Sequence, residues 1–331
     1  MAEYLTNTND LTKVATAIRE KGGTSDSLVY PDEFVIAIQA IQTGTKLQII
    51  VTVESGAIVT ATKGSLSVSG TSVNGTCTLI VPETGTWSVS ATLGGQTSNT
   101  KNVSVVDSYA VALNFMKNNF ADNNWSTIIA ACHSGSVPST WVVGNSKTMI
   151  INGASYQIDI IGKNHDDYAD GSGKAPLTFQ MHDCYADKKA MNSSNTSSGG
   201  WTSCVMRSTH LPAILALMPT EVQSGIREVN KLTSAGDRST TINTTADKLF
   251  LLSEVEIFGS TTYSVAGEGT QYDYYKAGNS KVKKWNGSAT YWGERSPSAI
   301  FSASFCMVGG SGYADVNDAS NANGVAFGFC F

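Results

Sequence analysis

Apolar and polar residues alternate along several short segments between residues 46 and 106. Turn pairs such as Asn74-Gly75 and Gly94-Gly95 separate these segments. Because successive side chains of a strand point to opposite faces, the alternation predicts short strands that form a small β-sandwich. The apolar positions are Leu47, Ile49, Val51 and Val53, then Cys77, Leu79 and Val81, then Trp87, Val89, Ala91 and Leu93, and then Val103 and Val105.

Residues 1–44 show the apolar spacing of helices instead. Asn9 and Asp10 can cap a first helix that Gly22-Gly23 ends, and a second helix opens at Pro31. Helices this short are not stable alone, so we expect them either to pack on a partner chain or larger particle, or to cap the next domain. Their apolar faces contain Leu11, Val14 and Ile18, and Phe34, Ile38 and Ile41.

From residue 108 onward the pattern mixes both kinds of element. Asn152-Gly153 stands between two strand-like runs and is the strongest hairpin signal in the chain. We therefore expect an α+β multidomain protein with an attachment segment at 1–44, a sandwich at 45–107 and a third domain at 108–331. The other elements expected in that domain are helices at Ala110–Phe120, Ser126–Cys132, Trp201–Leu217 and Glu221–Leu232, and strands at Thr178–Met181 and Lys248–Ile257.

The composition narrows the classes of function. Hydrophobic residues make up 41% of the 331 residues and charged residues 15%, against about 25% charged in an average soluble protein. Ser, Thr, Asn and Gly fill the difference, which is typical of turn-rich surface proteins. The net charge is −5 and the one basic cluster is Lys281, Lys283 and Lys284, so we expect no nucleic-acid binding.

The sequence shows neither a membrane anchor nor a secretion signal. It contains no run of 18 apolar residues, and it does not begin with the basic-then-apolar pattern of a signal peptide. We therefore expect no membrane insertion, synthesis in the bacterial cytoplasm, and release by lysis if the protein acts outside the cell. The cysteines form no C-x-x-C pair and are predicted to be buried thiols: Cys77, Cys132, Cys184, Cys204, Cys306 and Cys330.

Two short segments carry side chains that bind metals in other proteins: His165-Asp166-Asp167 and His182-Asp183-Cys184. Their spacing fits no standard ligand pattern, and Asp-rich turns more often hydrogen-bond their own backbone. We predict a structural role and no cofactor. A structural Ca²⁺, held by Asp and backbone oxygens, is the metal that these residues favour if one binds.

Two segments in the N-terminal part resemble proteins of phage tails. AIREKGGTSDSLVYPDEFVIAIQAI resembles a segment common at the start of tail-associated proteins of Firmicutes phages and prophages, and VPETGTWSVSATLGG resembles the immunoglobulin-like or carboxypeptidase-regulatory-like spacer modules of phage and surface proteins. The resemblance implies a virion protein that attaches to other tail proteins through residues 1–44. Trimers are common in such families, so a homotrimer is expected.

The third domain resembles a domain of unassigned activity that is frequent in Firmicutes genomes and prophages, through WVVGNSKTMIINGASYQIDIIGKNHDD, LLSEVEIFG, YWGERSPS and GVAFGFCF. Its ending also resembles the C-type-lectin-like fold of formylglycine-generating enzymes and of phage tropism determinants that retroelements diversify. The Arg-Pro or Arg-Leu usual after the glycine is replaced by Val325-Ala326 here, so the match is not complete. The family motif implies that Arg295 anchors the scaffold.

In formylglycine-generating enzymes a cysteine pair carries the oxidation chemistry. By that resemblance, Cys306 and Cys330 are the cysteines to consider for such a role. Both cysteines lie in apolar runs with no nearby cation to stabilise a thiolate, so core positions are predicted.

Glu254 and Glu256 lie on one predicted strand, which is more typical of a salt-bridged strand than of a glycosidase pair. No G-x-S-x-G elbow is present. We expect no enzymatic activity, with a glycan hydrolase as an alternative.

The residues after Tyr272 are rich in Tyr, Trp, Ser and Asn, the combination that antibody loops use for binding. We predict that the protein binds a bacterial cell-surface protein or glycan through this region, and the resemblance implies a variable protein of a diversity-generating retroelement. A virion structural or baseplate subunit, with these loops buried against another subunit, is an alternative. The candidate ligand-binding residues are Trp285, Asn286, Ser288, Thr290, Tyr291, Trp292, Ser296, Ser298, Ile300, Phe301, Ser302, Ser304 and Tyr313.

Overall fold

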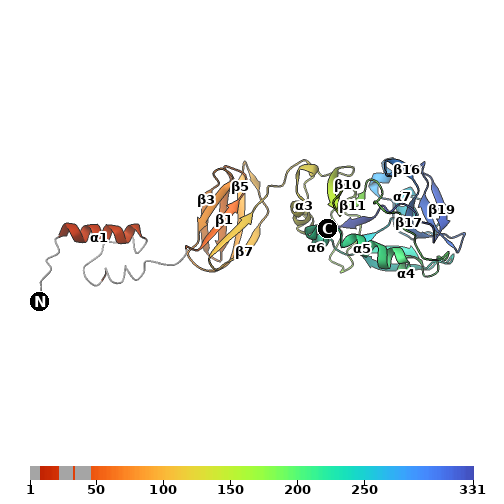
Figure 1. Cartoon of the computed structure of the whole chain (residues 1–331), viewed down its shortest axis with the longest axis horizontal. Helices are drawn as coiled ribbons and strands as arrows, with labels where there is room; N and C mark the ends of the chain where they lie inside the picture. The colour runs from red at the N-terminus through yellow and green to blue at the C-terminus, as the bar shows by residue number, and fades with distance from the viewer. Residues whose placement is uncertain (1–7, 22–32, 34–45) are drawn as a thin grey trace. The chain divides into compact units, whose positions relative to one another are not determined.

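The computed structural model describes residues 8–21, 33 and 46–331, and the chain divides into two compact units, Met1–Met116 and Lys117–Phe331 (Figure 1). Strands supply most of the regular structure and helices are short, so the α+β class is confirmed. Among the described residues, no helix is long and apolar enough to cross a membrane.

Helix α1 (Thr8–Glu20) confirms the first predicted helix. Asn9 and Asp10 lie within its first turn rather than before it, so they do not occupy the expected cap position. On its apolar face Ile18 is buried, whereas Val14 is exposed. The predicted stop at Gly22-Gly23, the helix from Pro31 and the boundary at 44/45 lie outside the described residues.

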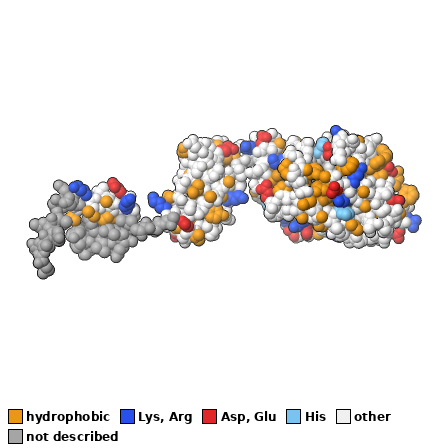
Figure 2. Space-filling view, in the orientation of Figure 1, with side chains coloured by type: hydrophobic (Ala, Val, Ile, Leu, Met, Phe, Trp, Pro, Cys, Tyr) orange, Lys and Arg blue, Asp and Glu red, His pale blue; other side chains and the backbone are white. Residues whose placement is uncertain are grey.

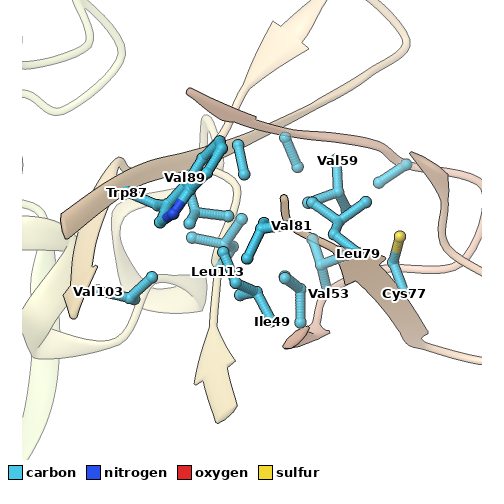
Figure 3. Packing of buried hydrophobic residues seen from close by; sticks show 14 of the residues in the cluster. Ile49, Val53, Val59, Cys77, Leu79, Val81, Trp87, Val89, Val103 and Leu113 are labelled. Carbon is cyan, nitrogen blue, oxygen red and sulfur yellow. The ribbon is translucent and has the colours of Figure 1, made fainter. Parts of the chain in front are cut away.

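The rest of the first unit is built from two sheets around one hydrophobic core (Figure 3). One sheet has the order β4-β1-β8, and the other has the order β3-β2-β5-β6 with β7 paired to β5. The predicted alternation is confirmed, since Ile49, Leu79 and Trp87 are all buried in this core. The strands are β1 (Gln48–Thr52), β2 (Ile58–Lys63), β3 (Leu66–Thr71), β4 (Thr76–Ile80), β5 (Gly85–Leu93), β6 (Gln96–Thr97), β7 (Lys101–Val105) and β8 (Ser108–Ala112).

The helix predicted at Ala110–Phe120 is wrong. Residues 108–112 form β8, which runs parallel to β1 and places Val111 opposite Val51. Strand β1 has β4 on its other side, so β8 completes its backbone hydrogen bonding. Leu113 and Phe115 then enter the same core, and the first unit therefore continues to Met116, beyond the expected boundary at 107/108.

The second unit contains a five-stranded sheet of order β14-β20-β11-β10-β9, a three-stranded sheet of order β17-β18-β19, and two hairpins. Its strands are β9 (Ser146–Ile151), β10 (Ala154–Gly162), β11 (Thr178–Met181), β12 (Val229–Ser234), β13 (Ile242–Asp247), β14 (Leu249–Phe250), β15 (Lys283–Trp285), β16 (Ser288–Thr290), β17 (Trp292–Pro297), β18 (Ser304–Val308), β19 (Ala314–Asp318) and β20 (Gly328–Cys330). Its helices are η1 (Phe120–Asp122), α3 (Trp125–His133), α4 (Gly200–Ser203), the π-helix η2 (Met206–His210), α5 (Leu211–Leu215), α6 (Thr220–Gly225), α7 (Glu254–Phe258) and α8 (Asp273–Lys276).

Several predictions for this unit are confirmed. Asn152 and Gly153 both have positive φ and connect β9 to β10, as the hairpin signal predicts. The predicted helix at Ser126–Cys132 is α3, and the predicted strand at Thr178–Met181 is β11. The predicted helix at Trp201–Leu217 is present as three short pieces, α4, η2 and α5.

Two predictions for this unit are wrong. The segment Glu221–Leu232 is helical only as far as Gly225, and its second half enters β12, which pairs with β13. The segment Lys248–Ile257 is a strand only at Leu249–Phe250. Helix α7 follows because Ser253 and Glu256 form a capping box that satisfies its first backbone N–H groups.

Candidate functional site

The second unit exposes four large side chains in the region that the sequence marks as a binding surface. Tyr291 is 43% exposed, Tyr313 48%, and Ile300 and Phe301 50% each. Figure 2 shows hydrophobic side chains gathered on the visible surface of this unit. We call Tyr291, Ile300, Phe301 and Tyr313 the aromatic face. Tyr291 and Tyr313 lie at one end of the β17-β18-β19 sheet, where β16 leads into β17 and β18 leads into β19, whereas Ile300 and Phe301 lie on the β17–β18 connection at the opposite end.

Local contacts fix the conformation of these connections. The Oγ atom of Ser298 accepts hydrogen bonds from the backbone N–H groups of Ile300 and Phe301, both at 3.1 Å. The hydroxyl oxygens of Tyr291 and Tyr313 are 3.5 Å apart, and this interaction raises the pKa of Tyr313. The Tyr313 ring lies over Gly309, where an added Cβ would be only 2.5 Å from Cζ. These contacts hold the backbone at Ile300 and Phe301 and the ring of Tyr313 before any partner binds.

Five of the thirteen candidate residues are not available to a partner, which corrects their prediction as contact residues. Strand β17 is buried on both faces, so a run that reads as a polar loop is part of the core. The indole of Trp292 donates to the backbone oxygen of Lys281, and Ser296 accepts from the backbone N–H of Glu254. The buried candidates are Thr290, Trp292, Ser296, Ser298 and Ser304.

The remaining candidates lie at two places. Ser302 is exposed in the loop of Ile300 and Phe301, and its backbone oxygen accepts from Ser197. Trp285, Asn286 and Ser288 lie on the β15–β16 hairpin, where Asn286 has a φ of 50° in the turn. This hairpin borders a cleft of about 370 Å³ rather than forming part of the aromatic face.

A buried network of charges is centred on Arg295 of strand β17. Arg295 is fully buried; its guanidinium contacts both carboxylate oxygens of Glu256, with Nη2 at 2.8 Å from Oε1. It also donates to the backbone oxygens of Leu232, Leu251 and Glu268. The predicted scaffold role of Arg295 is therefore confirmed. Burial by itself raises the pKa of Glu256, but Arg295 and Lys231 outweigh it and the pKa is lowered.

Asp166, from the first candidate metal segment, belongs to the same network. Lys231 Nζ is 2.6 Å from Asp166 Oδ1 and 3.0 Å from Glu256 Oε1, and all three groups are buried. The Tyr272 hydroxyl donates to Asp166 Oδ2 at 2.9 Å. Burial opposes ionisation of Asp166, but Lys231 outweighs it and lowers the pKa. Asp166 thus links three segments of the fold, as the predicted structural role requires.

The second candidate metal segment is also held by protein groups. His182 Nδ1 is 2.7 Å from Asp159 Oδ2, and this hydrogen bond raises the pKa of His182. Asp183 accepts from the backbone N–H of Lys284 at 2.7 Å. Within the described ranges, no group of three or more His, Cys, Asp or Glu side chains has a geometry that could hold a metal ion.

Three buried glutamates form an acidic group beside Arg295. Glu254 accepts from the backbone N–H groups of Tyr263 and Ser264, and Glu268 accepts from Ser234. Neither carboxylate oxygen of Glu294 has a hydrogen-bond partner within the part of the chain that the structure describes. Burial, together with Glu254 and Glu268, raises the pKa of Glu294 well above its ordinary value.

Cys306 and Cys330 are free, buried thiols, as predicted. Burial raises the pKa of both thiols well above the ordinary value, and for Cys306 the three glutamates act in the same direction. This is the opposite of the thiolate stabilisation that a reactive cysteine requires.

Reasoning from the sequence missed several residues that organise this region. Lys231, Tyr272, Glu268 and Asp159 stand in ordinary strand or loop sequence, and nothing local distinguishes them. The Ser253-x-x-Glu256 pattern is the one signal that marks α7, and through it the position of Glu256.

A family profile and a solved structure each match part of this chain. A family profile described as a domain of unknown function, DUF6273, matches residues 177–330, which lie in the second unit. No curated protein matches the chain. Among solved structures, a DUF4876 family protein from Bacteroides thetaiotaomicron VPI-5482 is similar over 46% of this chain and 37% of that chain, with 8% sequence identity and a TM-score of 0.17. This chain thus spans little more than a third of that protein's length, and a likeness this low carries no argument.

Proposed function

We propose that this chain is a non-enzymatic binding protein of the phage-tail kind, which recognises a protein or glycan on the bacterial surface through the aromatic face. The observation that carries the proposal is the set of four large side chains, each exposed by 43–50%, on loops that hydrogen bonds hold in place. The Tyr291 and Tyr313 hydroxyls meet at the surface, and aromatic rings supply contact area while losing little conformational entropy on binding.

The finer fold assignment is part of the same proposal. An immunoglobulin-like spacer is supported by the two sheets of the first unit around a single core. A C-type-lectin-like second unit is supported by strand β20, which lies between β14 and β11, and by the separate sheet β17-β18-β19 whose connections carry the aromatic face. Attachment to other tail proteins through residues 1–44, a place in the virion, assembly as a homotrimer and diversification by a retroelement belong to this proposal too.

The side chains considered for catalysis favour a binder over an enzyme. Glu254 and Glu256 are buried and bonded to neighbouring groups, so neither can reach a glycan at the surface. The thiols of Cys306 and Cys330 are buried and have raised pKa values.

The test is adsorption of the fluorescently labelled full chain to a panel of Firmicutes cells, measured by flow cytometry. The variant carries Tyr291→Ala, Ile300→Ala, Phe301→Ala and Tyr313→Ala. The matched control carries Val142→Ala, Ile150→Ala and Leu217→Ala, which are exposed to a similar degree in the same unit. Circular dichroism establishes that all three proteins are folded.

We expect the parent and the control to adsorb to at least one strain, and the four-site variant to lose at least tenfold in affinity, since central aromatic contacts dominate interfaces. Adsorption of the variant equal to that of the parent would contradict the proposal. Absence of adsorption to every strain would make the structural or baseplate subunit the better assignment. Analytical ultracentrifugation tests the trimer, which a monomer at micromolar concentration would exclude.

A further inference from the structure

A polar cleft of about 370 Å³ lies beside the β15–β16 hairpin, and the aromatic face does not contribute to it. Three segments form its walls: the start of β10, the loop after β11, and the turn of the hairpin. Its volume falls within the range of small-ligand sites, about 300–1,000 Å³. The side chains that matter for its chemistry are Tyr156, Gln157, His182, Asp183 and Asn286.

Hydrogen bonds fix two of these walls against each other. The backbone N–H of Lys284 donates to Asp183 Oδ1 at 2.7 Å, and the backbone N–H of Cys184 donates to the Lys284 oxygen at 2.9 Å. The Trp285 indole donates to the backbone oxygen of Ala186 at 2.6 Å. The cleft is therefore formed in advance, so a ligand does not have to order it.

His182 is oriented into the cleft by a buried acid. Its Nδ1 is 2.7 Å from Asp159 Oδ2, and Asp159 is 3% exposed and also accepts from Ser146 at 2.7 Å. The imidazole itself is 46% exposed and lines the cleft. Because Nδ1 is occupied, Nε2 is the ring nitrogen left to meet a ligand, as a donor or an acceptor.

The remaining lining groups suit a ligand with one apolar face and many hydroxyls. The Tyr156 ring is stacked on Tyr185, with centroids 5.5 Å apart and planes at 24°, so its orientation is fixed. Gln157 and Asn286 each supply an amide that donates and accepts, and Asp183 supplies a carboxylate. A pyranose ring presents C–H groups to an aromatic ring, and its neighbouring hydroxyls bridge amide and carboxylate groups.

We infer that this cleft is a carbohydrate site that takes one pyranose unit. The site is separate from the aromatic face, so this inference stands or fails independently of the proposed function. If both hold, the chain contacts a surface glycan at two places.

The experiment is saturation-transfer-difference NMR on the full chain with methyl β-D-glucopyranoside, methyl β-D-galactopyranoside and N-acetyl-D-glucosamine, and with inorganic phosphate as a competitor. Asn286→Gly removes an amide and keeps the turn, because glycine adopts a φ of 50° readily. Gln157→Ala removes the other amide from an exposed strand position. The matched control is Asn74→Gly, the same change at a φ of 53° in the first unit.

We expect saturation transfer to the ring C–H protons of at least one sugar, and a dissociation constant raised roughly 5–10-fold by each cleft variant but not by the control. The four-site variant of the aromatic face should bind the sugar as the parent does. Absence of transfer to all three sugars, a dissociation constant in both cleft variants equal to that of the parent, or displacement of the sugar by phosphate would each overturn the inference.

Discussion

The two units bury their interiors with different chemistry. In the first unit the two sheets meet through apolar side chains such as Ile49, Leu79 and Trp87. In the second unit the interior also contains a charged network in which Arg295 and Lys231 contact Glu256. An apolar core tolerates hydrophobic substitutions that conserve its volume, whereas a buried ion pair is costly to break because it leaves a charge without its partner. The second unit therefore depends on charge pairing as well as on apolar packing, and it is the one that carries the candidate sites.

The largest effect is expected from Arg295→Met. The substitution leaves Glu256 buried with one cation in place of two, and we expect the second unit to lose about 3–5 kcal/mol of unfolding free energy. Urea denaturation followed by circular dichroism measures the loss. Lys174→Met, which breaks the exposed pair with Asp167, is the control and should change stability by about 1 kcal/mol or less. Equal effects of the two changes would contradict a structural role for the network.

Leu79→Ala tests the core of the first unit. Leu79 is 2% exposed, so the truncation leaves a cavity and should cost about 2–5 kcal/mol. Ile80→Ala, at the next position on the opposite face of β4, is the control, because Ile80 is 48% exposed and its loss should cost roughly 0.5 kcal/mol or less. Calorimetry should show a lowered transition for the first variant alone; similar transitions for both would mean that the alternation does not define the core.

Glu294→Gln should stabilise the second unit at neutral and higher pH. The folded-state pKa of Glu294 lies above the unfolded value, so its contribution to stability is fully present below the unfolded pKa and is lost as pH rises through the folded pKa. Gln keeps the shape and cannot ionise. The melting temperature of the variant should exceed that of the parent at pH 8, and the difference should shrink toward pH 4. A parent that is the more stable protein at pH 8 would show that the carboxylate has a partner.

The smallest effect is expected at His182. Its pKa is raised by the hydrogen bond to Asp159, so its stabilising contribution is fully present below the unfolded pKa of about 6.5 and is lost as pH rises through the folded value. The imidazole is about half exposed, so solvent screening keeps the effect below about 1 kcal/mol. Parent and His182→Gln should differ more in melting temperature at pH 5.5 than at pH 9. A difference independent of pH would assign the effect to packing.

Much of the fold can be predicted from the sequence where the signal is local. The alternation that contains Ile49 and Leu79 and the Asn152-Gly153 turn each predict an element that the structure confirms. Prediction fails where a distant segment determines the secondary structure. Val111 lies in a strand because β1 offers a free edge for pairing, and the periodicity within residues 110–120 does not contain that information.

The candidate surface shows the same division. Tyr291, Ile300, Phe301 and Tyr313 are exposed as expected, but Ser296 and Ser298 are buried, and Ser296 accepts from the backbone N–H of the distant residue Glu254. Composition cannot decide which residues of this region face solvent. The charged network is harder still, because Lys231, Asp166 and Arg295 come together only through the tertiary fold.

The most direct test of the account is one substitution in the aromatic face, Phe301→Asp, assayed by equilibrium adsorption to a host strain that the parent binds. We expect an affinity reduced by at least about tenfold, because a charge replaces an apolar contact, together with an unchanged melting temperature, because Phe301 is half exposed. Adsorption equal to that of the parent would contradict the claim that this face binds the target.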